Sequence, residues 1–258
     1  MTPFLSCTSL PEVHARLIDW LQSPVGNALL RLEQTQLEIW LPKLFGYHLL
    51  FLGLPCAIED SLALSHIRHR IQVSQVVHTS AMTSRIQGHP EHLPIANDSI
   101  DAVVLFHALD FSPDPHQILR EVERVLIPEG QILIFGFNPL SLWGGWRLFA
   151  RCGGKAPWCG RFLMSYRVSD WLALLGFDRA LVAGLMFRLP IQQETLLRQS
   201  EFIESFGARW WPGLGAVYLI HGIKRVSRLR PIMMRWPLPS QVLSPLVTPT
   251  NAESPHRG

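Results

Sequence analysis

A strand, a helix and a second strand follow one another without interruption in the middle of the chain. Residues 100–106 and 131–137 are short runs dominated by Ile, Val, Leu and Phe, typical of strands that are buried on both faces. Residues 114–126 between them have apolar positions at helical spacing and open with Asp114 and Pro115, a favoured start for a helix. This alternation predicts right-handed βαβ units and a doubly wound, mostly parallel α/β sheet.

The flanking segments continue the alternation. Residues 10–44 have apolar positions at helical spacing with a break near 23–26, which predicts two helices before the first strand. Residues 47–52 form an almost wholly apolar run stopped by Gly53 and Pro55, as expected for a central parallel strand. The other expected elements are a helix over 57–66, a strand over 72–77, a turn at 128–130, a helix over 168–175 with a left-handed cap at Gly176, and strands over 177–182 and 216–223.

Composition restricts the class of protein. Of the 258 residues, 48% are hydrophobic and 17% are charged, which favours one large buried core over a disordered chain. A net charge of +3 is too small for binding that depends on neutralising phosphates, so we do not expect a nucleic-acid partner. The four cysteines form no close pair and the first residues do not resemble a signal peptide, so we expect a reduced, cytoplasmic protein without a metal site.

No apolar run is long enough to cross a membrane uninterrupted, so integral membrane association is not expected. The patterns divide the chain into an N-terminal helical cap over 1–41, a single α/β domain over 42–228 and a Pro/Ser-rich tail over 229–258 that we expect to be mobile. The oligomeric state is not predicted.

An ordered set of short motifs runs through residues 91–139. A Leu-Pro-Ile turn at 93–95 leads into a short acidic loop and a strand, and His107 to Asp110 follow that strand. The next helix and turn read Leu-x-Glu-x-x-Arg-Val-Leu-x-Pro-x-Gly from Leu119 to Gly130. In order and spacing, this stretch resembles the class I S-adenosylmethionine-dependent methyltransferases of the type 11 group. Residues 136–144 resemble a small bacterial subgroup of that family.

The resemblance implies a seven-stranded sheet whose last strand runs antiparallel. It also implies S-adenosyl-L-methionine as the cofactor, held at the carboxyl ends of the first, second and fourth strands, and transfer of its methyl group to a small-molecule acceptor that the sequence does not identify. The ligand position agrees with the general behaviour of open parallel sheets, which bind ligands beyond the strand ends where the strand order reverses.

The cofactor loop departs from the family pattern. The family has acidic-x-Gly-x-Gly-x-Gly after the first strand, where glycine lets the backbone approach the ligand, but residues 51–57 read Phe-Leu-Gly-Leu-Pro-Cys-Ala. Only Gly53 is retained, followed by Leu54. The family has an acidic residue at the end of the second strand, but Ser, Gln75 and Val stand there in this chain. A further acidic position of the family aligns with His89, and Glu91 lies in the same loop.

Charged hydrogen bonds contribute about 1.5–3 kcal/mol each, so the loss of two without replacement would weaken cofactor binding by about a hundredfold. Two interpretations stay open. Gln75 and Glu91 replace the missing acceptors, with Gly53, Leu54, His89, Leu93 and Phe106 completing the cofactor site; or the site has lost its ligand, and the protein is a non-catalytic binding or regulatory protein. A nucleotide-dependent oxidoreductase is disfavoured because the G-x-G-x-x-G fingerprint is also missing.

His107 is the candidate catalytic residue, because it follows the fourth strand and an unperturbed imidazole suits a general base. The alternative is a histidine hydrogen-bonded to a neighbouring loop. Asn138 could direct an amide towards the substrate or could cap a helix. Trp143, Trp146, Trp158 and Phe162 could cover a flat acceptor or could simply pack. Methyl transfer is a direct displacement that orientation and desolvation can accelerate, so it requires no universal catalytic side chain.

Overall fold

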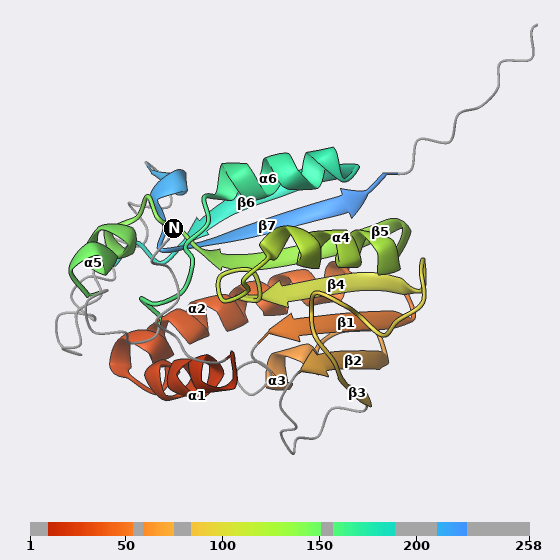
Figure 1. The fold of residues 1–258 in the computed structure, drawn as a ribbon, viewed down its shortest axis with the longest axis horizontal. Helices are drawn as coiled ribbons and strands as arrows, with labels where there is room; N and C mark the ends of the chain where they lie inside the picture. Colours follow the sequence, from red (N-terminus) through yellow and green to blue (C-terminus); the bar gives the residue numbers. More distant parts are fainter. Residues whose placement is uncertain (1–9, 54–58, 75–83, 151–156, 189–210, 226–258) are drawn as a thin grey trace, which may run out of the picture. The chain divides into compact units, whose positions relative to one another are not determined.

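A computed structural model of the chain describes residues 10–53, 59–74, 84–150, 157–188 and 211–225 (Figure 1). Its central sheet has the strand order β3-β2-β1-β4-β5-β7-β6. The strands are β1 (His48–Gly53), β2 (His69–Ser74), β3 (Ser84–Gln87), β4 (Ile100–Phe106), β5 (Leu126–Phe137), β6 (Phe177–Leu185) and β7 (Val217–Lys224). All neighbouring strands from β3 to β5 are parallel, and β7 runs antiparallel to both β5 and β6. The predicted doubly wound sheet with an antiparallel last strand is confirmed.

Helices cover both faces of this sheet. They are α1 (Leu10–Leu21), α2 (Pro24–Trp40), α3 (Glu59–Leu62), α4 (Pro115–Val125), α5 (Leu142–Ala150) and α6 (Ser165–Leu174), with short 3₁₀ turns η1 (Leu41–Lys43) and η3 (Pro212–Leu214). Successive strand residues point to opposite faces. Leu49 and Phe51 of β1 pack in one core with α1 and α2, whereas Leu50 and Leu52 pack in the other with α4 and α6. Every central strand is therefore apolar on both faces.

Local capping accounts for several helix boundaries. The Ser23 hydroxyl accepts a hydrogen bond from the Gly26 amide at 3.2 Å, and Pro24 opens α2. The predicted break between the first two helices is thus at Ser23, and Gly26 lies inside the second helix. The Asp114 carboxylate caps α4 by accepting from the Gln117 amide at 3.1 Å. After α6, Gly176 has a φ of +84°, the left-handed conformation that was expected there.

Other boundaries differ from the sequence prediction. The predicted helix over 57–66 is only Glu59–Leu62 among the described residues, because the chain turns where Leu64 and Ser65 donate to Ser61 and Leu62. β2 begins at His69, and residues 75–77 of the predicted strand lie outside the described part. β5 begins at Leu126 and not at the predicted residue 131, because Ile100 pairs with Leu126. The register then shifts, and the predicted turn at 128–130 forms a bulge within the strand. β3 and α5 were not predicted.

Within the residues that the structure describes, none of the helices has the length and apolar character needed to cross a membrane. The predicted C-terminal tail over 229–258 lies outside those residues.

Candidate functional site

The direction in which successive strands are added to the sheet reverses at β1, and the candidate site lies beyond the strand ends at this point. β1 pairs with β2 on one side and with β4 on the other, all three parallel, so their carboxyl ends meet at the same edge of the sheet (Figure 1). Open α/β sheets bind ligands beyond this edge. The last residues of β1 and β4, Gly53 and Phe106, are direct partners across the strand pair. Two residues predicted from separate motifs are therefore neighbours at the switch point.

Gly53 is required by the backbone at this point. Its φ is +128°, and a Cβ placed on it would lie 2.0 Å from the carbonyl oxygen of Phe106. An L-amino acid side chain is disfavoured by both the torsion and the contact. The candidate Leu54, which follows directly, lies outside the described residues, as does Gln75 after β2.

The loop between β3 and β4 brings further candidates to this edge. Leu93 is only 5% exposed and shares a core cluster with Leu52 near the end of β1 and Val73 near the end of β2. The Glu91 carboxylate accepts a hydrogen bond from the Ser112 hydroxyl at 2.8 Å. His89 is exposed and forms an isolated bridge with His92. Gly53 thus pairs with Phe106, whereas Leu93 packs in the core that contains Leu52 and the Phe106 side chain packs in the other core. Glu91 is oriented by the segment that follows β4.

His107, directly after β4, lies in a buried polar triad. Its Nδ1 is 2.9 Å from Oδ2 of Asp110, and its Nε2 is 2.9 Å from Oε1 of Glu33 in α2. His107 is 4% exposed and Glu33 is 0% exposed. The imidazole also stacks on Phe137 at the end of β5, with ring centroids 4.2 Å apart. The N-terminal helices are therefore joined to the candidate site through a charged residue.

The two carboxylates keep His107 protonated. Burial alone lowers the pKa of His107, but the charge of Glu33 and the hydrogen bonds that the ring donates to Asp110 and Glu33 outweigh it and raise the pKa to about 9. Burial raises the pKa of Asp110, against the opposing effect of His107. The second oxygens of the Glu33 and Asp110 carboxylates have no hydrogen-bond partner among the described residues. One imidazolium thus lies between two buried carboxylates.

Both ring nitrogens of His107 are occupied in this arrangement. A general base needs a free nitrogen lone pair, so the predicted catalytic role would require a proton and one carboxylate partner to leave. His107 also has a φ of +54°, which is uncommon for a residue with a Cβ and is typical of constrained functional positions. Its catalytic role stays a prediction.

The remaining candidates after β5 are engaged in packing. The Asn138 side-chain amide donates to the carbonyls of Gly213 and Gly215 at 2.7 and 3.0 Å, which fastens η3 to the end of β5. Asn138 does not cap α5, which begins only at Leu142, and its side-chain oxygen accepts a hydrogen bond from the Leu140 amide at 3.1 Å. Trp143, Trp158 and Phe162 are buried in the core cluster, whereas Trp146 is exposed.

Glu33 was missed by sequence reasoning, although the sequence carried a signal. Leu29, Glu33 and Leu37 are spaced four apart on α2, and all three are fully buried. Residues four apart lie on one face of a helix, so a carboxylate between two core leucines indicates a buried partner.

The raised pKa of His107 predicts a pH-dependent stability. The unfolded pKa is 6.5 and the native pKa is about 9, so between these values the native state binds more protons and the free energy of unfolding falls as pH rises. The stabilisation is complete below pH 6.5 and is lost towards pH 9, with a total size of about 3 kcal/mol. Urea denaturation across this pH range measures it. Glu33→Gln, which removes the nearest charge, should show a smaller decline, and a flat wild-type profile would contradict the triad.

The residues around the candidate site resemble a known protein family. Residues 60–134, which run from α3 through β4 and α4 to the middle of β5, match the methyltransferase domain family of type 11. This part of the chain is therefore similar to methyltransferase domains of type 11. The match contains the loop with Glu91 and Leu93 together with Phe106 and His107, whereas Glu33 and Gly53 precede it. The resemblance seen in the sequence is confirmed.

Two curated relatives match part of the chain. The uncharacterized protein YafS of Escherichia coli K12 is 36% identical over 159 residues, which cover 62% of this chain and 64% of YafS. A malonyl-[acyl-carrier protein] O-methyltransferase of Halorhodospira halophila is 33% identical over 104 residues, covering 39% of this chain and 34% of that protein. The chain thus spans less than two thirds of the length of either relative.

Solved structures share the fold of the domain. A S-adenosylmethionine-dependent methyltransferase of Thermotoga maritima, described as a possible histamine N-methyltransferase, superposes with a TM-score of 0.57 at 18% identity, covering 83% of this chain and 99% of its own. A S-adenosylmethionine-dependent methyltransferase of Archaeoglobus fulgidus gives a TM-score of 0.54 at 15% identity, covering 76% and 94%. At these identities, the likeness concerns the fold.

Proposed function

We propose that this protein transfers a methyl group from S-adenosyl-L-methionine to a small-molecule acceptor. The observation that carries the proposal is the direct pairing of Gly53 with Phe106 at the switch point of the sheet, with Leu93 in the adjoining core. In an open parallel sheet this edge is where a nucleotide-like ligand binds. The type 11 domain match covers β2, β4 and most of β5 at this edge, and β1 with Gly53 precedes the matched residues.

The residues at this edge have the chemistry that such a ligand needs. Gly53 lets the backbone after β1 come close to a ligand, and Leu93 offers apolar surface to an adenine ring. When both carboxylates are ionised, Glu33 and Asp110 carry two negative charges beside the single positive charge of His107. A cationic ligand complements that charge. When bound, S-adenosyl-L-methionine supplies the activated methyl group and carries positive charge on its sulfonium.

The chain's own contribution to the reaction would be binding, orientation and exclusion of water. Phe106, Phe135 and Phe137 form an apolar wall near His107, with Phe106 and Phe135 centroids 5.4 Å apart. Displacement at the methyl carbon is favoured by a dry, oriented site and needs no covalent intermediate. His107 would accept the acceptor's proton only if its hydrogen bond to Glu33 opened and the imidazolium lost its proton.

Isothermal titration of the purified full chain with S-adenosyl-L-methionine and S-adenosylhomocysteine tests the proposal. We expect saturable binding of both ligands at micromolar to sub-millimolar concentrations, and weaker or no binding of ATP, which carries adenosine on an anionic chain. The negative charge of the triad is the reason for that preference. Absence of heat with both ligands at millimolar concentration would overturn the proposed activity.

A second function is favoured by a specific observation. Both nitrogens of His107 are held by carboxylates and the residue is nearly inaccessible, which suits a structural centre in a non-catalytic binding or regulatory protein. Native mass spectrometry of the protein as purified separates the two. A bound adenosyl compound supports the enzyme, whereas a ligand-free chain with a stoichiometric protein partner supports the binding protein.

A further inference from the structure

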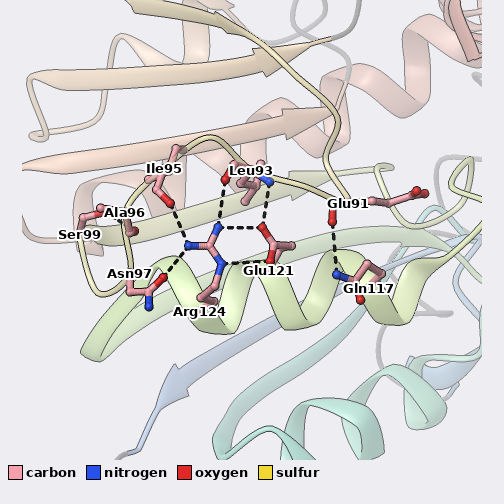
Figure 2. A network of polar contacts seen from close by, with 9 residues as sticks. All are labelled: Glu91, Leu93, Ile95, Ala96, Asn97, Ser99, Gln117, Glu121 and Arg124. Carbon is pink, nitrogen blue, oxygen red and sulfur yellow. Dashed lines mark hydrogen bonds and ion pairs between the residues drawn. The ribbon is translucent and has the colours of Figure 1, made fainter.

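The loop that carries Glu91 and Leu93 is fastened to α4 by a fork of hydrogen bonds from Arg124 (Figure 2). Nη1 of Arg124 donates to the carbonyl of Ile95 at 2.9 Å and to Oδ1 of Asn97 at 2.6 Å. Nη2 donates to the carbonyl of Leu93 at 3.0 Å. A planar guanidinium has its donors in a fixed fork, so three acceptors on one loop fix that loop's shape as well as its position.

Glu121, one turn earlier on α4, completes the attachment. Its Oε1 and Oε2 accept from Nε and Nη2 of Arg124 at 3.0 and 2.8 Å, and Oε2 also accepts from the backbone amide of Leu93 at 2.9 Å. The hydrogen bond from Arg124 lowers the pKa of Glu121, so the carboxylate stays charged. Leu93 is thus held through both its amide and its carbonyl. We call Glu121 and Arg124 the loop clamp.

A second attachment holds the start of the same loop. The Gln117 side-chain amide donates to the carbonyl of Glu91 at 3.4 Å, and Ser112 binds the Glu91 carboxylate. Figure 2 shows that Gln117, Glu121 and Arg124 come from one helix and face the loop, whereas Ser112 precedes that helix. Since α4 packs on the core face formed by β4 and β5, the loop takes its position from the rigid centre of the sheet.

We propose that Glu121 and Arg124 are positioning residues for the adenosyl ligand, acting through the loop that carries Glu91 and Leu93. The inference rests on the proposed function and extends it to two residues that do not touch the ligand edge themselves. A preformed loop loses less conformational freedom when the ligand binds. Loss of the loop clamp therefore weakens binding of the ligand while the sheet stays folded.

The test uses S-adenosylhomocysteine affinity, measured by isothermal titration well below the melting temperature of every variant. Arg124→Gln and Glu121→Ala are each expected to weaken binding about tenfold, because part of the free energy of the hydrogen bonds that order the loop must then be supplied on binding. The double variant should be little weaker than either single variant, because both residues act through one attachment. Hydrogen exchange at the Leu93 amide should quicken in Glu121→Ala, which loses that amide's acceptor.

Two controls separate positioning from general stability. Arg120→Gln makes the same charge change at an exposed residue of the same helix and should change affinity by less than about twofold. Leu172→Ala removes buried surface in α6, which packs against β6 and β7 and makes none of the hydrogen bonds of the loop clamp. Leu172→Ala should lower the melting temperature at least as much as Arg124→Gln does. Its affinity for S-adenosylhomocysteine should stay close to that of the wild-type chain.

The outcomes are distinct. Wild-type affinity in Arg124→Gln would overturn the inference while the proposed function stands, and so would equal weakening in Leu172→Ala. If the wild-type chain binds no S-adenosylhomocysteine, the proposed function fails first and the inference fails with it. Weakened binding in both loop-clamp variants, with the ligand affinity of the two controls unchanged, supports the inference.

Discussion

Replacing Glu33 with Ala should destabilise the protein by about 3–5 kcal/mol, the cost of leaving a buried charge without its partner. Glu33 is fully buried, and its carboxylate is 2.9 Å from Nε2 of His107. Without it, the imidazolium loses one of two counter-charges and α2 loses its polar contact with the end of β4. Chemical denaturation near neutral pH measures the effect.

Glu38→Ala is the matched control, because Glu38 is an exposed carboxylate on the same helix. It should change the free energy of unfolding by less than about 0.5 kcal/mol. Glu33→Gln keeps an acceptor for His107 but removes the charge. Its loss of unfolding free energy should therefore lie between those of Glu33→Ala and Glu38→Ala. If Glu33→Ala and Glu38→Ala were equally mild, the triad would contribute nothing to holding the helices on the sheet.

Gly53→Ala is the second substitution for which we expect a large effect. The added Cβ would meet the Phe106 carbonyl oxygen at 2.0 Å and would have to adopt a φ of +128°. Strain in that region of φ and ψ costs about 1–3 kcal/mol before any displacement of β4 is counted. We therefore expect a clear fall in melting temperature, together with loss of measurable S-adenosylhomocysteine binding because the end of β1 must move.

Gly145→Ala provides the comparison for Gly53→Ala. A Cβ at Gly145 in α5 would have nothing within 4 Å, and alanine is favoured over glycine within a helix by about 1 kcal/mol. This variant should keep or slightly raise the melting temperature and keep the ligand affinity. Normal binding and stability in Gly53→Ala would show that the described approach of β1 to β4 is wrong.

The sheet was largely predictable because its central strands are apolar on both faces. Residues 100–106 were predicted as a strand, and β4 has those bounds. The helix before β5 was predicted to within one residue at each end, since Asp114 and Pro115 mark its start. β3 was missed because its four residues, Ser84–Gln87, include none that is fully buried and so leave no apolar run.

The candidate site was only partly predictable, for a physical reason. Gly53, Leu93 and Phe106 follow motifs or strand ends, so parallel topology alone brings them to one edge. Glu33 lies 74 residues before His107 in the chain, and its partner depends on how α2 packs across the sheet. No local pattern specifies such a contact. The buried position of Glu33 on an apolar helix face was visible, but the identity of its partner was not.

The loop clamp was more predictable than the Glu33 contact and less predictable than the strand ends. Glu121 and Arg124 were recognised as part of a family-like motif, and their spacing places both on one side of a helix. Their contacts with Leu93, Ile95 and Asn97 depend on the loop folding back over α4. Sequence reasoning therefore identified the residues but not what they hold.

The central claim is that the carboxyl ends of β1, β2 and β4 hold an adenosyl ligand. A crystal structure of the full chain with saturating S-adenosylhomocysteine tests it most directly. We predict density for the ligand at this edge, with adenine against Leu93 and the amino-acid end towards Gly53 and the His107 triad. Density at another surface, or an edge closed by the protein's own side chains at saturating ligand, would contradict the claim.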